Sequence, residues 1–217
     1  MVMAANPEAR PAAPFDLSGG HPALDLVNSL DNRFARDGPV ELLGGYGDLL
    51  RFAEQSQLLD AQGARLLARS VNPAAAARAL RAARELREAL AAVLYGYLEG
   101  RVPATADILV LERRFHDAER HRELRWESEA AGSPARARLQ WQWGRSARAA
   151  DFPVWLVAHA ASQLLSSQSM ERMRACGAET CRWLFLDTSK NHTRRWCNMR
   201  VCGNRAKARK FQQRHAD

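Results

Sequence analysis

Residues 176–207, CGAETCRWLFLDTSKNHTRRWCNMRVCGNRAK, contain all four cysteines of the 217-residue chain. The cysteines form two pairs, Cys176-x4-Cys181 and Cys197-x4-Cys202, which a loop of 15 residues joins. Four thiolates can surround Zn²⁺ as a tetrahedron, and two turns that each supply two thiolates meet this need. Because no cysteine lies outside this segment, disulfides do not hold the remaining chain together. The spacing therefore predicts a four-cysteine Zn²⁺ site.

The segment between the two pairs predicts a short strand over residues 182–187. Trp183 and Phe185 would lie on one side of this strand, and Leu184 and Leu186 on the other. A unit of this size has little core, so we expect the aromatic side chains, together with Trp196, to pack around the metal.

Other interpretations of the segment stay open. The cysteines could be reduced buried thiols or a redox pair, although their clustering favours the metal site. His192 could replace a cysteine as a ligand, but we expect it to be a loop residue that faces solvent. Asp187 could support a metal ligand, but we expect it to end the strand and cap the next turn.

A basic helix is predicted after Gly203, with Cys202 at its N-terminal end, where the helix dipole favours a thiolate. On a helical wheel Asn204, Ala208 and Phe211 share one side, which we expect to pack against the strand. The remaining face is basic, and cationic side chains contact phosphate groups. The predicted nucleic-acid contacts are Arg194, Arg195, Arg200, Arg205, Lys207, Arg209, Lys210, Gln213 and Arg214.

The positive charge of the chain is confined to this C-terminal segment. Residues 1–170 contain 20 basic and 20 acidic residues, whereas residues 171–217 contain 12 basic and 4 acidic residues. The net charge of +8 therefore belongs to the last 47 residues. An excess of this kind attracts polyanions, and on charge alone membrane surfaces and acidic proteins stay open as partners. Because the charge adjoins the predicted zinc site, we expect DNA to be the partner.

The run from Cys176 to Lys207, with its four cysteines, Phe185, Asp187 and the terminal Cys-Gly-Asn-Arg, resembles the CGNR zinc finger. The upstream region, which begins with FDLSGGHPALDLVNSL at residue 15, is similar to the ABATE domain that usually precedes this finger. The resemblance implies a stress-induced bacterial transcription regulator. It also implies that Cys176, Cys181, Cys197 and Cys202 are the zinc ligands.

The expected fold class is mainly α with a small β-hairpin (α+β). Residues 1–14 are expected to be a disordered lead, 15–170 a helical ABATE-like domain, and 171–217 a treble-clef-like zinc finger with a basic C-terminal helix. Apolar periodicity predicts helices near 22–30, 47–57, 60–70, 73–98, 105–115 and 152–165. The helix at 73–98 has the clearest signals, because Asn72 can cap it, Pro73 suits its first turn and Gly100 ends it.

A hairpin is predicted from the runs ELRWESEA and ARARLQWQW, with a turn at Gly132-Ser133-Pro134. Leucine and tryptophan alternate with polar residues in both runs, which is typical of a sheet with one buried face. We therefore expect the Trp126, Trp141 and Trp143 side chains to be buried, although they could instead line an apolar pocket.

The junction before the first helix contains a polar cluster that includes Gly20, His21, Asp25 and Asn28. Free amide groups at a helix start can receive an anion, so a site for a small-molecule effector is one interpretation. The other is a tight turn followed by a polar helix surface. The glycines lack a following Lys-Ser/Thr, which excludes a nucleoside-triphosphate loop.

The sequence lacks a membrane-length apolar run and a secretory signal, so we expect a cytoplasmic protein that does not associate with membranes. It shows no catalytic triad or open metal site, and we expect no enzymatic activity. The leading hypothesis is a homodimeric transcription regulator with Zn²⁺-stabilised DNA-binding fingers, since one finger makes few contacts. The alternative is a protein-interaction module in which Trp183 and Trp196 bind a partner.

Overall fold

The computed structural model describes residues 14–128 and 137–214. Its helices are α1 (Pro22–Asn28), α2 (Tyr46–Gln55), α3 (Ala61–Ser70), α4 (Pro73–Leu98), α5 (Thr105–Glu119), α6 (Phe152–Leu165) and α7 (Asn204–Arg214). Three two-stranded antiparallel sheets accompany them: β1 (Leu30–Asp31) with β2 (Val40–Glu41), β3 (Glu123–Ser128) with β4 (Ala137–Gln142), and β5 (Met173–Ala175) with β6 (Leu184–Leu186). The predicted fold class, mainly helical with small sheets, is confirmed.

The helix α4 is the longest of the described helices, and its predicted boundaries are confirmed. The Asn72 side chain accepts a hydrogen bond from the Ala75 N–H at 2.9 Å, and Pro73 occupies the first turn. Gly100 follows the last turn with a φ of +64°, a left-handed conformation that glycine adopts without strain. The local sequence therefore determines where this helix begins and ends.

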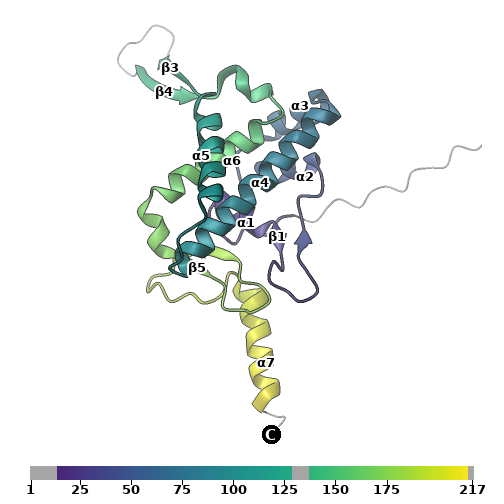
Figure 1. Cartoon of the computed structure of the whole chain (residues 1–217), viewed down its shortest axis with the longest axis vertical. Coiled ribbons are helices and arrows are strands. Elements are labelled where there is room, and N and C mark those ends of the chain that lie inside the picture. The colour runs from purple at the N-terminus through teal and green to yellow at the C-terminus, as the bar shows by residue number, and fades with distance from the viewer. Residues whose placement is uncertain (1–13, 129–136, 215–217) are drawn as a thin grey trace, which may run out of the picture.

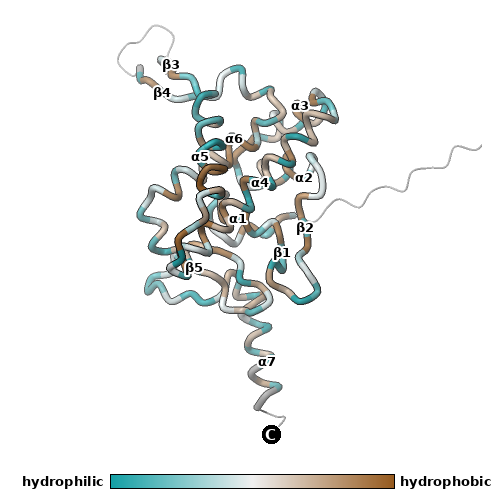
Figure 2. Tube along the Cα trace, in the orientation of Figure 1, coloured by the Kyte–Doolittle hydropathy of each residue, from teal (hydrophilic) through white to brown (hydrophobic). Residues whose placement is uncertain are grey.

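The helical body forms around α4 and α6. α4 packs against α1, α2 and α5, and α6 contacts the same three helices. Figure 2 shows that hydrophobic segments gather where these helices meet. The largest fully buried side chains here are Leu24, Leu26, Leu43, Leu49, Phe52, Leu67, Leu86, Leu90 and Leu94.

The β3–β4 hairpin projects from one end of the helical body (Figure 1), and its structure corrects one prediction. Trp126 and Trp141 are 67% and 57% exposed, so the expected burial of their side chains is wrong. Only Trp143, just beyond β4, is partly buried, with its ring 5.6 Å from the ring of Phe152. The predicted turn at residues 132–134 lies outside the described residues.

The β5–β6 sheet attaches the cysteine-rich segment to the helical body. Met173 and Leu184 belong to the same hydrophobic core as the helices, and Leu186 packs against that core. Phe185 points the other way, into a small cluster with the cysteines. The predicted alternation along the strand is therefore confirmed, and the structure adds that its leucine face is buried against the helical body.

The helix α7 projects from the opposite end of the molecule (Figure 1). Asn204, Ala208 and Phe211 are all exposed, so the prediction that they pack against the strand is wrong. The helix begins just after Cys202 and its axis leads away from the body, which leaves these side chains out of reach of β6. Among the described residues, no helix combines the length and the apolar character that crossing a bilayer demands.

Candidate metal centre and basic helix

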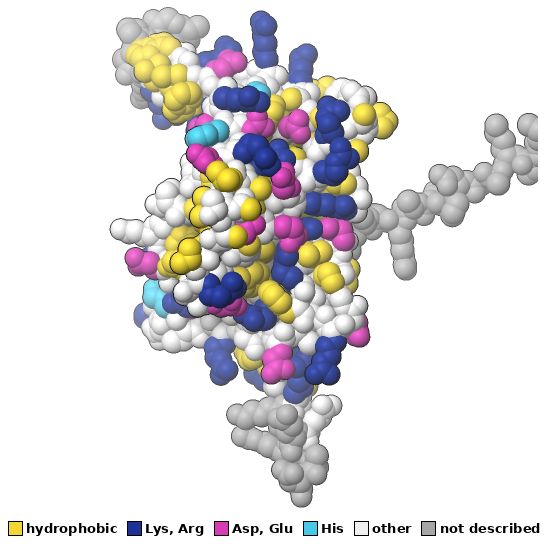
Figure 3. Space-filling view, in the orientation of Figure 1, with side chains coloured by type: hydrophobic (Ala, Val, Ile, Leu, Met, Phe, Trp, Pro, Cys, Tyr) yellow, Lys and Arg dark blue, Asp and Glu magenta, His cyan; other side chains and the backbone are white. Residues whose placement is uncertain are grey.

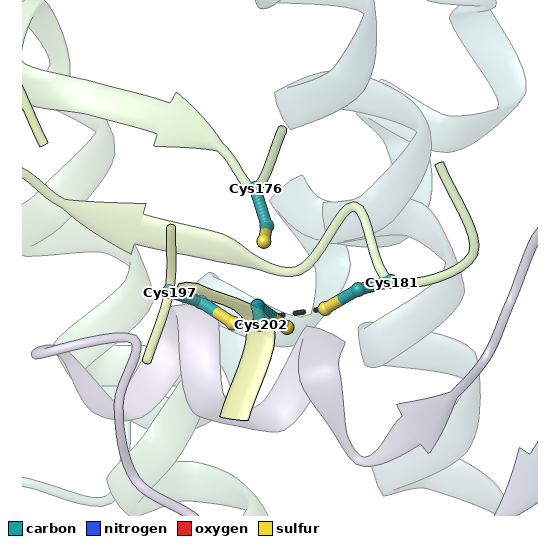
Figure 4. A group of neighbouring side chains, drawn as sticks. All are labelled: Cys176, Cys181, Cys197 and Cys202. Carbon is teal, nitrogen blue, oxygen red and sulfur yellow. Dashed lines mark hydrogen bonds between the residues drawn. The ribbon is translucent and has the colours of Figure 1, made fainter. Parts of the chain in front are cut away.

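Four cysteines from two turns converge beside β6 (Figure 4). Cys176 directly follows β5, and its N–H donates to the Trp183 carbonyl at 2.8 Å, which closes the first turn around Cys181. Cys197 and Cys202 flank the second turn, in which the Cys202 N–H donates to the Asn198 carbonyl at 2.9 Å. The backbone hydrogen bonds of the two turns thus fix the ligand directions.

The geometry of the four sulfurs fits a tetrahedral ion. All four lie within 4.8 Å of one another, with 3.6 Å between Cys181 and Cys197 and 3.7 Å between Cys197 and Cys202. A Zn–S bond of about 2.3 Å places the sulfurs of a tetrahedron about 3.8 Å apart. None of the four forms a disulfide. These four residues would hold a zinc ion. Its bonds to the sulfurs would stabilise the finger, whose hydrophobic core is too small to do so alone.

The thiols titrate as a group. Hydrogen bonds from Cys181 and Cys197 lower the pKa of Cys176, whereas the interaction with Cys176 raises the pKa of Cys181 and of Cys197. Burial raises the pKa of Cys202. The interactions among the sulfurs therefore favour one thiolate and oppose further ionisation, which a bound cation would favour.

Aromatic rings surround the cysteine cluster, as the sequence predicts for Trp183, Phe185 and Trp196. Two glycines leave room for the Trp196 ring, since a Cβ atom on Gly177 or on Gly203 would lie 3.3 Å from it. A Cβ atom on Gly203 would also clash with the Met199 sulfur. Both glycines therefore allow the Trp196 ring to lie close to the backbone.

Asp187 and His192 have the structural roles that the sequence favours. Asp187 is fully buried and accepts hydrogen bonds from the N–H groups of Ser189 and Arg194, both at 2.9 Å. It thus caps the turn that follows β6. His192 is exposed in the loop and lies outside the group of sulfur ligands.

Of the predicted ligand cluster of Gly20, His21, Asp25 and Asn28, it is Asn28 that joins the helical body to the finger, while His21 and Asp25 form hydrogen bonds at the start of α1. The Asn28 side chain accepts from the Leu184 N–H and donates to the Leu184 carbonyl, both at 2.9 Å, as a neighbouring strand would. The Asp25 carboxyl accepts from the Gly19 N–H at 2.8 Å, and His21 caps α1. Asp25 and Asn28 are only 6% and 2% exposed, and these hydrogen bonds satisfy their polar groups in the interior.

Further contacts across this junction, which the sequence does not reveal, extend it beyond Asn28. The Leu186 N–H donates to the Gly19 carbonyl at 2.9 Å, and Tyr95 Oη donates to the Arg182 carbonyl at 2.9 Å. The Trp183 indole N–H donates to Asp31 at 2.9 Å. Trp183 is therefore engaged within the protein, which weakens the idea that it forms an open platform for a partner.

The predicted basic contacts divide into two groups. Arg194 is half-buried, its guanidinium lies 4.5 Å from the centre of the Phe185 ring, and its Nε donates to the Trp196 carbonyl. It therefore has a stabilising role in the finger, and its phosphate contact stays a prediction. The exposed group is Arg195, Arg200, Arg205, Lys207 and Arg209. The side chains of Lys210, Gln213 and Arg214 lie outside the described residues.

The fold and the site define a class: a helical domain with a four-cysteine zinc finger docked against it. Residues 20–168 match the ABATE family, described as "putative stress-induced transcription regulator", and residues 172–215 match the CGNR zinc finger. The chain therefore belongs to the ABATE family and ends in a CGNR zinc finger, as the sequence resemblance implies. A search of curated proteins finds no match.

Proposed function

We propose that this chain is a transcription regulator that binds DNA through its zinc finger and α7. The observation that supports this most is the position of α7, which projects from the body directly after the ligand Cys202. Arg205, Lys207 and Arg209 are exposed along it. Exposed cations on an accessible helix are suited to phosphate contacts, which position a protein on a duplex.

The helical domain is proposed to receive the signal. A groove of about 620 Å³ on this domain is lined in part by Phe34, Tyr95 and Glu99. The same three residues contact Arg182 of the finger: Glu99 forms an ion pair with it, and both rings lie beneath its guanidinium. Because Arg182 follows the ligand Cys181, a small-molecule effector in the groove would act directly on the finger.

Two further features belong to this proposal. A single finger makes few contacts with DNA, so we expect a homodimer in which two fingers contribute to binding. Four protein ligands leave no coordination position for water, so we expect the zinc to be structural and the chain to have no catalytic activity. We also propose a cytoplasmic location, where cysteines stay reduced and available to bind zinc.

DNA binding is tested by measuring affinity for duplex DNA across a range of salt concentrations, with the zinc-loaded full chain. We expect a steep decrease of affinity with salt, because each phosphate contact releases counterions. The triple variant Arg205→Ala, Lys207→Ala, Arg209→Ala should bind more weakly. Its log–log slope should be smaller by about one unit for each phosphate contact that the substitutions remove.

The matched control replaces three exposed arginines on the helical body, Arg65, Arg69 and Arg81, by alanine. This variant changes the net charge by the same amount but leaves α7 intact, so affinity and slope should stay close to those of the wild type. A slope near zero for the wild-type protein, or equal decreases in the two triple variants, would contradict DNA binding through α7.

A further inference from the structure

The β3–β4 hairpin exposes four large apolar side chains on one face, which we name the Trp/Leu face: Leu124, Trp126, Leu139 and Trp141. Their exposed fractions are 50%, 67%, 57% and 57%. Figure 3 shows hydrophobic side chains gathered on this projecting end of the molecule. An isolated two-stranded hairpin is only marginally stable in water, so a face of this kind is expected to be covered by a partner.

The register of the hairpin makes the Trp/Leu face complementary to itself. Leu124 is opposite Trp141, and Trp126 is opposite Leu139, so the tryptophans occupy one diagonal and the leucines the other. Suppose that a second copy faces the first across a twofold axis that lies in the interface, parallel or perpendicular to the strands. Each tryptophan then lies over a leucine of the other copy. A tryptophan facing the smaller leucine can interdigitate with it, as a well-packed interface requires.

The charge of the hairpin favours a protein partner over a polyanion. Glu123 and Glu127 point to the opposite face of the ribbon together with Arg125 and Arg138, so this face has no net charge. The Trp/Leu face itself contains no ionisable side chain. One cation lies at its base, where the Arg122 guanidinium is 5.4 Å from the centre of the Trp141 ring.

The area is sufficient for a dimer. Tryptophan side chains each bury about 150–250 Å² when fully covered, so two partly exposed tryptophans and two leucines offer roughly 500 Å² per copy. If these side chains are covered completely, two copies would bury about 1,000 Å², which is the lower limit for a specific interface. Exposed apolar patches on monomers rarely exceed a few hundred Å² unless they are functional.

We propose that two copies of this chain associate through their Trp/Leu faces. This inference rests on the homodimer of the proposed function and identifies the surface that forms it. The hairpin and α7 lie at opposite ends of the molecule (Figure 1), so the interface leaves both basic helices uncovered. The second copy then covers the Trp/Leu face, which the helical body leaves exposed.

The test compares two neighbouring substitutions in β4, Leu139→Glu and Gln140→Glu, in the zinc-loaded full chain. Both add one carboxylate, but alternation along a strand places Leu139 on the Trp/Leu face and Gln140 on the polar face. Sedimentation equilibrium should show a dimer for the wild type and for Gln140→Glu. Leu139→Glu should weaken the dimer by about 100-fold or more, because a buried leucine is replaced by a carboxylate in each copy.

A second variant, Trp126→Ser, should weaken the dimer as well, and both variants should keep the thermal unfolding of the wild-type monomer. A wild-type chain that stays monomeric at every concentration overturns the proposal, as does a dimer that Leu139→Glu and Trp126→Ser leave intact. In the latter case dimerisation within the proposed function survives through another surface. A dimer that fails to bind DNA would overturn the proposed function and leave this interface standing.

Discussion

The molecule contains two small antiparallel sheets with aromatic side chains, and their surroundings differ. In the β5–β6 sheet, Phe185 is fully buried against the cysteines, and Leu184 is fully buried against the helices. In the β3–β4 hairpin, Trp126 and Trp141 are more than half exposed. The local patterns of the two segments are similar, because each alternates side chains between two faces. What separates them is whether another part of the chain reaches the apolar face.

Each sheet is covered to a different extent by the rest of the chain. The metal centre lies against one face of β6, and the helical body lies against the other, with the Asn28 amide bonded along its edge. Within the described residues, no comparable packing covers the Trp/Leu face. An alternating pattern therefore predicts that a face can be buried, while the partner that buries it can belong to another chain.

Removal of the metal should have the largest effect on stability. This effect should be confined to the finger with its β5–β6 sheet and should not reach the β3–β4 hairpin. Structural zinc contributes about 10–16 kcal/mol in small fingers, so chelation should sharply lower the thermal unfolding temperature. Hydrogen exchange should speed up at residues 184–186, which lie in a finger strand that borders the helical core. Amides at residues 124–126 should exchange as before.

The matched control for metal removal is Cys202→Ser, in which chelator should cause little further change. Elemental analysis should show one zinc per wild-type chain, and less in the variant. Unchanged unfolding of the metal-free wild type would mean that the ion does not stabilise the finger.

Truncation of Trp183, which directly precedes β6, and of Trp126 in β3 compares the two surroundings directly. Trp183→Ala removes a ring packed on the cysteine cluster and its hydrogen bond to Asp31, and should lower the free energy of unfolding by about 3–4 kcal/mol. Trp126→Ala should change it by less than about 0.5 kcal/mol when the chain is monomeric. Denaturant unfolding at low protein concentration measures both values. Equal decreases in the free energy of unfolding would show that the two tryptophans do not differ in how they are packed.

Asn28→Ala tests the hydrogen bonds along the edge of β6. The substitution leaves both the N–H and the carbonyl of Leu184 buried without their partner, and should cost about 2–4 kcal/mol in the free energy of unfolding. Asn191→Ala, in an exposed part of the finger loop, is the matched control and should be nearly neutral. Comparable decreases in the two variants would argue against this role of Asn28.

The smallest effect concerns Asp25, which lies in the same junction. Burial raises the pKa of this carboxyl to about 7. The folded protein then binds more protons than the unfolded chain between about pH 4 and pH 7, so stability should fall as the pH rises through this window. Asp25→Asn keeps the acceptor for Gly19 and should remove this dependence, with a gain of about 1–2 kcal/mol at pH 8.

Unfolding measured against pH provides the test for Asp25. Asp37→Asn, which changes an exposed carboxyl, should retain the pH dependence of the wild type. A wild-type stability that stays flat from pH 4 to pH 7 would show that Asp25 ionises normally in the folded protein.

Features that depend on neighbouring residues could be predicted from the sequence. The Asn72 cap, the Gly100 stop and the six other helices follow from local signals. The cluster of four cysteines that could hold a metal follows from their spacing, because a ligand pair within one tight turn has few other geometries. Strands β1, β2 and β5 were not predicted, because two or three residues give no measurable periodicity.

Features that depend on distant contacts could not be predicted in the same way. Asn28 and Leu184 are separated by 156 residues, so nothing near either residue reveals their two hydrogen bonds. Arg194 has the same side chain as the exposed Arg195, and only its position over the Phe185 ring makes it a stabilising residue. A count of charges cannot separate the two.

Residue type and short-range spacing are sufficient to predict the helices, the candidate metal ligands and the location of the excess charge, and the run from Cys176 to Lys207 carries the family resemblance. Only the tertiary structure shows that the finger is fixed to the helical body through Asn28, that α7 projects, and that the Trp/Leu face is exposed. The physical reason is that burial is a property of how separate segments meet. It depends on which surfaces come together in space, and a strand's own pattern specifies only that one of its faces is apolar.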